Sequence, residues 1–247
     1  MLDQPRIADF AIWLVALALY VFDAARLLTP RQMLLVEAGR GRLASAFSAD
    51  PFTITGRALV FTPLLRPYRG AFVAPWGRPW AAAPALRAAL ADVDALRGTL
   101  RPARVLAAWV FLLLFVAGPA LTLALGTDPA VLCVAAVLYP SVLVTIAVVW
   151  WRRRAWRLGR GAAALLSLEV LVCPAFLPNL VRKITAAHAI EVDGPQILVA
   201  TAPAEVAQDF VGRLTSRAEA LINEAGDDPD GQAAALREYV AAVRAAQ

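Results

Sequence analysis

Residues 105–151 read VLAAWVFLLLFVAGPALTLALGTDPAVLCVAAVLYPSVLVTIAVVWW and contain one charged residue, Asp128. The flanking segments 105–125 and 130–151 are uncharged, and about 20 helical residues cover the roughly 30 Å of a bilayer's hydrocarbon core. The short connection around Asp128 leaves room only for a tight turn. The sequence therefore predicts an antiparallel transmembrane hairpin over 105–151, with a kink at Gly118-Pro119.

The composition of the whole chain agrees with a membrane protein. Apolar residues make up 60% and charged residues 17% of the 247 positions, against about 45–50% and 25% in soluble domains. The chain has one histidine, His188, and two cysteines, Cys133 and Cys173. Too few soft ligands remain for a multi-ligand metal centre, and any histidine relay would have to use His188. We therefore expect no catalytic residues, no metal and no cofactor, and hence a protein that is not an enzyme.

The first apolar run predicts a transmembrane helix within residues 1–28. Its uncharged centre lies between Asp9 and Asp23, and Trp13 and Tyr20 are expected in the aromatic zones near the two interfaces. A secretory signal peptide is the alternative for a run of this length. Because no small-residue cleavage site follows, we favour a retained helix.

Residues 29–104 predict a basic α+β loop domain. A hairpin is expected around Gly56, and Pro84 is expected to open a helix. The segment 66–80, RPYRGAFVAPWGRPW, contains too much proline for a helix or a central strand. Its arginines and aromatic residues predict contact with lipid headgroups or a partner protein; the alternative is a stiff interfacial loop. The predicted contact residues are Arg66, Tyr68, Arg69, Phe72, Trp76, Arg78 and Trp80. The membrane tether makes lipid a simpler anion than nucleic acid, which we do not expect as a partner.

The distribution of arginine predicts the orientation. Residues 24–104 contain twelve arginines and four acids, and residues 152–160 contain five arginines and no acid. By the positive-inside rule, the large loop is cytoplasmic and the N-terminus lies outside, in a multi-pass protein of a bacterial-type inner membrane. An aromatic pair and an arginine cluster are the predicted interfacial anchors: Trp150, Trp151, Arg152, Arg153 and Arg154.

Residues 152–184 predict an arginine-rich linker followed by a broken membrane helix. The stretch LLSLEVLVCPAFLPN at 165–179 is apolar but contains Pro174 and Pro178. Basic residues flank both of its ends, so both ends favour the cytoplasm. We favour a re-entrant or interfacial helix over a kinked full span.

Three polar residues of this stretch are candidate site residues: Glu169, Cys173 and Asn179. Glu169 could carry a proton or an ion, since carboxylates at membrane depth usually face protein or water. The alternatives are a structural carboxyl paired with Ser167, Asn179 or another subunit, and a water-exposed carboxylate on a shallow helix; we favour structural use. Metal binding at Cys173 would require Cys133 as a second soft ligand and is disfavoured.

Residues 185–247 predict an acidic soluble tail with two helices. A short hairpin is expected at 188–192 and 196–200, followed by helices from Glu205 and after Asp228-Pro229. The tail has ten acids and four arginines. If it lies on the same side as the basic loop, the two segments can form one charge-complementary module.

The predicted fold class is a mostly α integral membrane protein with three transmembrane helices, a fourth broken or re-entrant helix and a small α+β cytoplasmic module. The predicted function is a non-enzymatic accessory or scaffold subunit of a larger inner-membrane complex. Its expected partners are membrane lipids and either other membrane-protein subunits or further copies of itself. The alternative is a small transporter or proton-coupled channel that uses Glu169.

Overall fold

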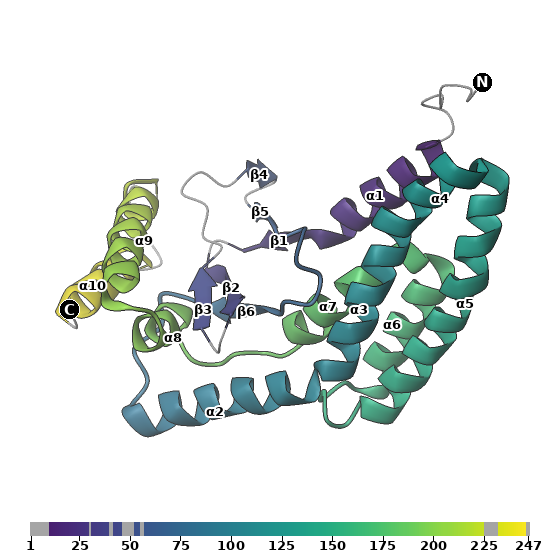
Figure 1. Ribbon diagram of the computed structural model, residues 1–247. Coiled ribbons are helices and arrows are strands. Elements are labelled where there is room, and N and C mark those ends of the chain that lie inside the picture. The colour runs from purple at the N-terminus through teal and green to yellow at the C-terminus, as the bar shows by residue number, and fades with distance from the viewer. Residues whose placement is uncertain are drawn as a thin grey trace. The chain divides into compact units, whose positions relative to one another are not determined.

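The computed structural model describes residues 10–29, 31–39, 42–45, 52–54, 57–224 and 232–245 (Figure 1). The chain is mostly helical with a small sheet part. It forms two compact units, both discontinuous in sequence. The first unit comprises residues 1–26, 61–70 and 95–187, and the second comprises residues 27–60, 71–94 and 188–247.

The first unit is a bundle of apolar helices. Its elements are α1 (Ala11–Ala24), α3 (Arg101–Leu112), a π-helical turn (Leu113–Ala117), α4 (Gly118–Leu125), α5 (Thr127–Arg152), α6 (Arg160–Val172), a 3-10 segment (Pro174–Asn179) and α7 (Leu180–Ala186). In the described part of the chain, two helices are long and apolar enough to cross a membrane, Arg101–Leu125 and Thr127–Arg152. They pack side by side, and Gly126 turns the chain between them with a φ of +85° (Figure 1). A side chain at this position would be strained, so glycine is required there.

The irregularity expected at Gly118-Pro119 takes a specific form. The helix adopts a π-helical turn over Leu113–Ala117, directly before the proline. Proline lacks the backbone N–H and its ring clashes with the preceding turn, so a local change in hydrogen bonding is the expected response. Pro140 lies within α5 without ending it.

The first apolar run forms a shorter helix than expected. Helix α1 ends at Ala24, and the chain continues directly as strand β1 (Ala25–Leu28) rather than as helix to residue 28. Its 14 described residues measure about 21 Å, below the roughly 30 Å of a bilayer core. Residues 1–9 lie outside the described part of the chain.

The two aromatic side chains predicted at the interfaces of that helix lie inside the protein. Trp13 is buried and donates a hydrogen bond from Nε1 to Thr122 Oγ1, at 2.8 Å. Tyr20 is buried against the rings of Phe111 and Phe115. Because helix α1 is packed on the α3–α4 helix, its aromatic residues face protein instead of the bilayer interface.

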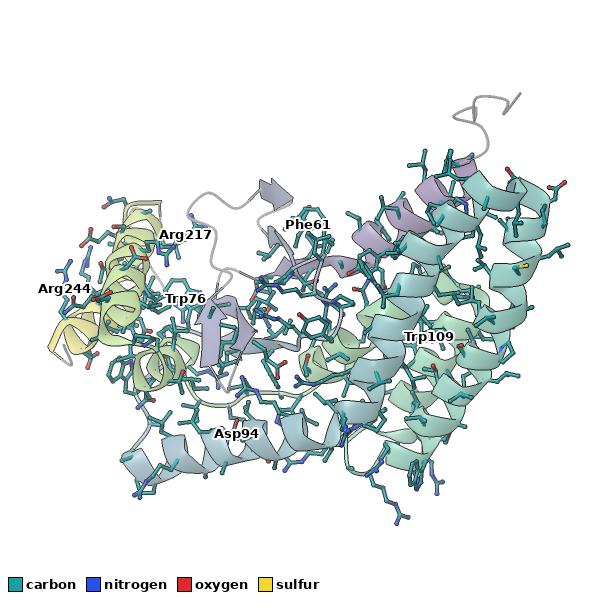
Figure 2. The ribbon with its side chains drawn as sticks, in the orientation of Figure 1. Phe61, Trp76, Asp94, Trp109, Arg217 and Arg244 are labelled. Carbon is teal, nitrogen blue, oxygen red and sulfur yellow. The ribbon has the colours of Figure 1, made fainter. Side chains whose placement is uncertain are left out.

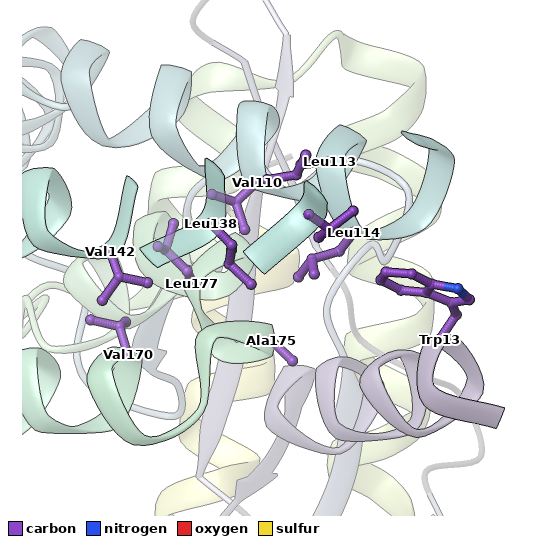
Figure 3. Close-up of a cluster of buried hydrophobic side chains, with 10 residues drawn as sticks. Trp13, Val110, Leu113, Leu114, Leu138, Val142, Val170, Ala175 and Leu177 are labelled. Carbon is purple, nitrogen blue, oxygen red and sulfur yellow. The ribbon is translucent and has the colours of Figure 1, made fainter. Parts of the chain in front are cut away.

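The core of the first unit brings these helices together. Figure 3 shows Trp13 of α1 and Ala175 of the 3-10 segment beside residues of the long helices. The buried members are Trp13, Val110, Leu113, Leu114, Val134, Leu138, Val142, Val170, Ala175 and Leu177. The broken fourth helix therefore belongs to the same core as the hairpin.

The second unit contains most residues of the described strands and the C-terminal helices. Its elements are β2 (Gln32–Gly39), β3 (Arg42–Ser45), β4 (Phe52–Ile54), β5 (Arg57–Phe61), β6 (Ala71–Pro75), α2 (Ala83–Thr99), α8 (Gly194–Thr201), α9 (Ala204–Glu224) and α10 (Gln232–Ala245). Strand β1, strand β5 and helix α2 contain residues of both units. The strands form two three-stranded sheets, in the orders β1-β5-β4 and β3-β2-β6. The pairing of β4 with β5 confirms the hairpin expected around residue 56.

Strand β2 is covered on both faces. Leu34 and Val36 join a cluster with Leu28 of β1 and Val60 of β5. On the opposite face, an added Cβ at Gly194, the first residue of α8, would lie 2.6 Å from the sulfur of Met33. Glycine is therefore needed for the close approach of the tail helix to the strand.

The hairpin expected at 188–200 is wrong. Residues 194–201 form α8, with Pro195 in its first turn. Proline at this position is pre-organised for a helix and needs no hydrogen bond from its nitrogen. The burial of Ile197 and Leu198 then stabilises a helix where the sequence pattern suggested a strand.

The other elements expected in the tail and loop are present. Helices α9 and α10 match the two predicted tail helices, and α2 begins beside Pro84. The cap expected at Asp228-Pro229 lies outside the described residues. Segment 66–80 contains β6, an edge strand beside β2, which is the position in a sheet that proline tolerates.

Candidate functional site

The first unit contains a cluster of charged side chains around Lys183, the only lysine of the chain. Its ammonium lies 2.6 Å from Oε2 of Glu169 and 2.8 Å from Oδ1 of Asp23. It also lies 4.8 Å from the ring centre of Phe176. A single compact cation therefore bridges a carboxylate of α6 and a carboxylate of α1.

Asn179 connects this ion pair to a second, more deeply buried cation. Its side-chain amide donates to Oδ2 of Asp23 and to the backbone oxygen of Tyr20, both at 3.0 Å. Its oxygen accepts a hydrogen bond from Arg182. Asn179 is thus oriented by three partners and fixes the end of helix α1 against the broken helix.

Arg182 is almost completely buried, with 1% of its surface exposed. Besides Asn179, its guanidinium donates to the hydroxyl of Tyr20 and to the backbone oxygen of Pro63. The Tyr20 hydroxyl in turn donates to the backbone oxygen of Leu64. A buried guanidinium is costly unless its donors are satisfied. Both terminal nitrogens of Arg182 have acceptors, and the bond to Pro63 ties the segment 61–70 into the first unit, whereas Nε has no partner among the described residues.

Tyr20, the hydrogen-bond partner of Arg182, packs beside the middle of one long apolar helix. The Tyr20 ring packs 5.7 Å from Phe111 and 5.2 Å from Phe115, centre to centre. These residues are close to the centre of the helix Arg101–Leu125.

A cavity of about 320 Å³ opens next to the ion pair. Its polar wall contains Asp23, Arg26, Glu169 and Lys183, and its apolar wall is formed by residues of the linker, α6 and α7. The side chain of Glu169 is 32% exposed, that of Asp23 13% and that of Lys183 9%. Glu169 is therefore the carboxylate with the most access to the cavity.

The structure assigns the three membrane candidates to two environments. Glu169 and Asn179 belong to the charge cluster, Glu169 through Lys183 rather than through Ser167 or Asn179. Cys173 ends α6 and packs against the hydrophobic core, and it lines a separate apolar cavity of about 290 Å³ between α1 and α5. Cys173 is a free thiol, as is the exposed Cys133. Among the described residues, no group of three or more histidines, cysteines and acids is placed to hold a metal ion.

The seven residues of the predicted lipid or partner contact surface at 66–80 are divided between the two units. Arg66, Tyr68 and Arg69 belong to the first unit, whereas the remaining four residues belong to the second. Phe72 and Trp76 are buried in the second unit, with 0% and 1% exposed, and so cannot make such contacts. They were misassigned because the sequence does not show that β6 pairs with β2 and packs against the tail. Arg78 is exposed and donates to the backbone oxygen of Glu191, and Trp80 is half-buried.

The predicted interfacial anchors lie at the end of α5. Trp150 and Trp151 are 42% and 73% exposed. The guanidinium of Arg152 stacks 4.5 Å from the ring centre of Trp151. Arg153 is half-buried and Arg154 is exposed.

The residues that sequence reasoning missed are Tyr20, Asp23, Arg182 and Lys183. One signal was available, because a single lysine in a chain with 24 basic residues is unusual. Lysine and arginine differ at such a site: an ammonium can bridge two carboxylates as a point charge, whereas a guanidinium favours one carboxylate through a planar fork.

The second unit has its own buried polar group. Asp193 accepts hydrogen bonds from the backbone N–H of Arg78 and the hydroxyl of Tyr239, at 3.2 and 2.9 Å. Burial raises the pKa of Asp193 to about 6, outweighing the hydrogen bonds that lower it. Burial also raises the pKa of Tyr239, and the charge of Asp193 adds to the effect. The pair joins the loop segment to the last helix of the tail.

Comparisons with known proteins give no assignment. No known protein family, no curated protein and no solved structure matches the chain. The geometry of the two units therefore carries the functional proposal.

Proposed function

We propose that this chain is a non-enzymatic accessory or scaffold subunit of a larger complex in a bacterial-type inner membrane. The observation that carries the proposal is the pairing of both Glu169 and Asp23 with Lys183, at 2.6 and 2.8 Å. Carboxylates held in this way stabilise the contact between α1, α6 and α7. Each carboxylate has Lys183 as its ion-pair partner, which favours a structural role over a catalytic one.

The composition of the second unit supports the topology of this proposal. Its core combines segments that precede the long hairpin with the tail that follows residue 187. Gln196 of the tail exchanges two hydrogen bonds of 2.8 Å with the backbone of Ala81, and Gly194 contacts Met33 and Ala74. Segments that share a core lie on the same side of a membrane, so the chain between them crosses an even number of times.

This parity favours a re-entrant fourth helix. The helices Arg101–Leu125 and Thr127–Arg152 supply two crossings. A full crossing by α6 and α7 would be a third and would separate the tail from the loop. The break at Pro174–Asn179, packed in the hydrophobic core, provides the protein-covered irregular backbone that a re-entrant helix requires. The arginine distribution supports a cytoplasmic second unit. A crossing by the first apolar run, of which α1 is the described part, would put the N-terminus outside.

Gentle detergent extraction of the tagged chain from its native membrane tests the scaffold proposal. We expect a stable partner, or further copies of the chain, to co-purify. A monodisperse monomer without partners under these conditions would contradict it. A reporter fused to the C-terminus is expected to be active on the cytoplasmic side, and an outside location would overturn the re-entrant topology.

A small transporter or proton-coupled channel is the second candidate. The favouring observation is that the Glu169 side chain is about one-third exposed and lines the 320 Å³ cavity. Purified protein in proteoliposomes with a pH gradient provides the test. Proton flux that is lost in Glu169→Gln and retained in the control Arg154→Gln would favour this function over the scaffold.

A further inference from the structure

We infer that the cavity beside Glu169 binds the headgroup of an anionic glycerophospholipid, with the phosphodiester at Arg26 and a headgroup hydroxyl at Glu169. This inference depends on the membrane location in the proposed function, but not on the existence of a protein partner. Its evidence is the charge, the size and the walls of the cavity.

Among the described residues, Arg26 is the cation of the cavity wall that no carboxylate pairs with. The charged residues that line the cavity are Arg26, Lys183, Asp23 and Glu169. Both carboxylates are already paired with Lys183. Within the described part of the chain, the Arg26 side chain has neither a hydrogen-bond acceptor nor a carboxylate partner. A phosphodiester carries one negative charge and can pair with the Arg26 guanidinium.

The polar wall also provides an acceptor. Lys183 occupies Oε2 of Glu169, and the side chain remains about one-third exposed next to the cavity. A hydroxyl of a glycerol headgroup can donate to this carboxylate while its phosphodiester binds the guanidinium of Arg26. At about 320 Å³, the cavity has the size of a small ligand site, for which roughly 300–1,000 Å³ is typical.

The other wall favours a lipid over a soluble phosphate. Leu158, Leu165 and Leu166 line the cavity, and Leu165 begins an exposed stripe with Leu168 and Val172 along one side of α6. Positions three and four residues apart share a helix face, so the stripe is continuous. A headgroup in the cavity would therefore direct its acyl chains along an apolar surface.

Native mass spectrometry of the detergent-purified full chain tests the site. The probes are phosphatidylglycerol, phosphatidylcholine and glycerol 3-phosphate, each titrated against the same protein. We expect phosphatidylglycerol to bind at least about tenfold more tightly than either other probe, since a desolvated arginine–phosphate pair is a strong interaction. Equal binding of phosphatidylcholine would overturn the anionic selectivity, and equal binding of glycerol 3-phosphate would replace the lipid by a soluble phosphate ester.

Matched variants separate the cavity from general surface attraction. Arg26→Gln is expected to weaken phosphatidylglycerol binding about tenfold or more. Arg154→Gln removes an exposed arginine outside the cavity and is expected to weaken it less than about threefold. Equal weakening by both variants would overturn the site. Ala162→Leu, which adds bulk at the cavity wall and keeps every charge, should also reduce binding, and unchanged binding would contradict the location.

The result is distinguishable from failure of the proposed function. Lipid binding by a chain that purifies without a partner would contradict the scaffold proposal and retain the lipid site. Co-purification of a partner without selective binding of phosphatidylglycerol would retain the scaffold proposal and contradict the lipid site. Circular dichroism of each variant confirms that a loss of binding does not reflect unfolding.

Discussion

The two units bury polar groups in different ways. In the first unit, buried charges form ion pairs, in which Lys183 contacts Asp23 and Glu169. In the second unit, the loop and the tail meet through apolar contacts and hydrogen bonds to backbone, such as those of Gln196 with Ala81, and through His188 Nε2 and Asp92 Oδ2 at 3.0 Å. This histidine–carboxylate contact pairs a basic group of the acidic tail with an acid of the basic loop, the reverse of what the two compositions suggest.

The difference follows from what surrounds each polar group. In a bundle of apolar helices, a buried charge has little water to solvate it, so it requires either a counter-ion, as Lys183 has, or hydrogen-bond acceptors, as Arg182 has. Residues of the second unit such as Arg244 and Glu219 form exposed ion pairs, which contribute little to stability (Figure 2). Stability there depends more on close packing, as at Gly194.

The largest expected effect comes from removing the bridging cation. Lys183→Met leaves two carboxylates facing each other without a counter-ion and should lower the free energy of unfolding of the first unit by about 3 kcal/mol. Chemical denaturation in detergent, followed by hydrogen exchange of α6 and α7, measures the loss. Arg154→Met is the control and should change little. Equal stability of Lys183→Met and the wild type would show that the ion pairs are not the main link between these helices.

The buried acid of the second unit predicts a pH dependence. The pKa of Asp193 is raised to about 6 in the fold, from 3.8 in the unfolded chain. The folded state therefore holds the proton of Asp193 more tightly than the unfolded chain does. The stabilisation that this proton gives to the fold is complete below about pH 4 and is lost as the pH rises through 6. The increase in the pKa from 3.8 to about 6 corresponds to a change in the free energy of unfolding of at most roughly 3 kcal/mol.

Hydrogen exchange of α8 and α10 amides at pH 4.5 and 7.5, corrected for intrinsic exchange, measures this dependence. Asp193→Asn cannot titrate at this position. The stability of the wild type relative to this variant should therefore fall as the pH rises from 4.5 to 7.5. A wild-type advantage that increases between pH 4.5 and 7.5 would contradict the raised pKa.

A packing change should affect the second unit by a smaller amount. Gly194→Ala places a Cβ 2.6 Å from the Met33 sulfur and 2.9 Å from the Ala74 Cβ. Such overpacking costs about 1–3 kcal/mol, measured as faster exchange in β2 and α8. Gly212→Ala is the control, because its Cβ would meet nothing within 4 Å in helix α9, and it should stabilise that helix by up to about 1 kcal/mol. Similar effects of the two substitutions would remove the evidence for tight loop–tail packing.

The smallest effect concerns one neutral hydrogen bond of the first unit. Trp13→Phe removes the donor to Thr122 and should lower the free energy of unfolding by about 1 kcal/mol. Trp109→Phe is the matched control, since the Trp109 side chain is exposed and its bond to Ser141 measures 3.2 Å (Figure 2). Thermal unfolding in detergent should separate the two variants. A larger loss for Trp109→Phe would mean that the buried hydrogen bond is not important for this unit.

The sequence alone determined the apolar hairpin and the broken helix. Long uncharged runs and paired prolines act through local physics, because backbone hydrogen bonding and apolar length do not depend on distant partners. The structure has helices at Arg101–Leu125 and Thr127–Arg152 and a break at Pro174–Asn179, as expected. The tail helices α9 and α10 were likewise predictable from their apolar periodicity.

Only the tertiary structure decided which residues meet. Asp23 and Lys183 are 160 positions apart, and nothing in either local sequence indicates the other. The same holds for Trp76 and Phe72, whose burial depends on a tail more than 100 residues away, and for α8, whose helical form depends on packing against β2. Long-range burial and charge pairing are properties of the assembled fold. The sequence therefore predicted that Glu169 needed a partner, and the fold supplied Lys183.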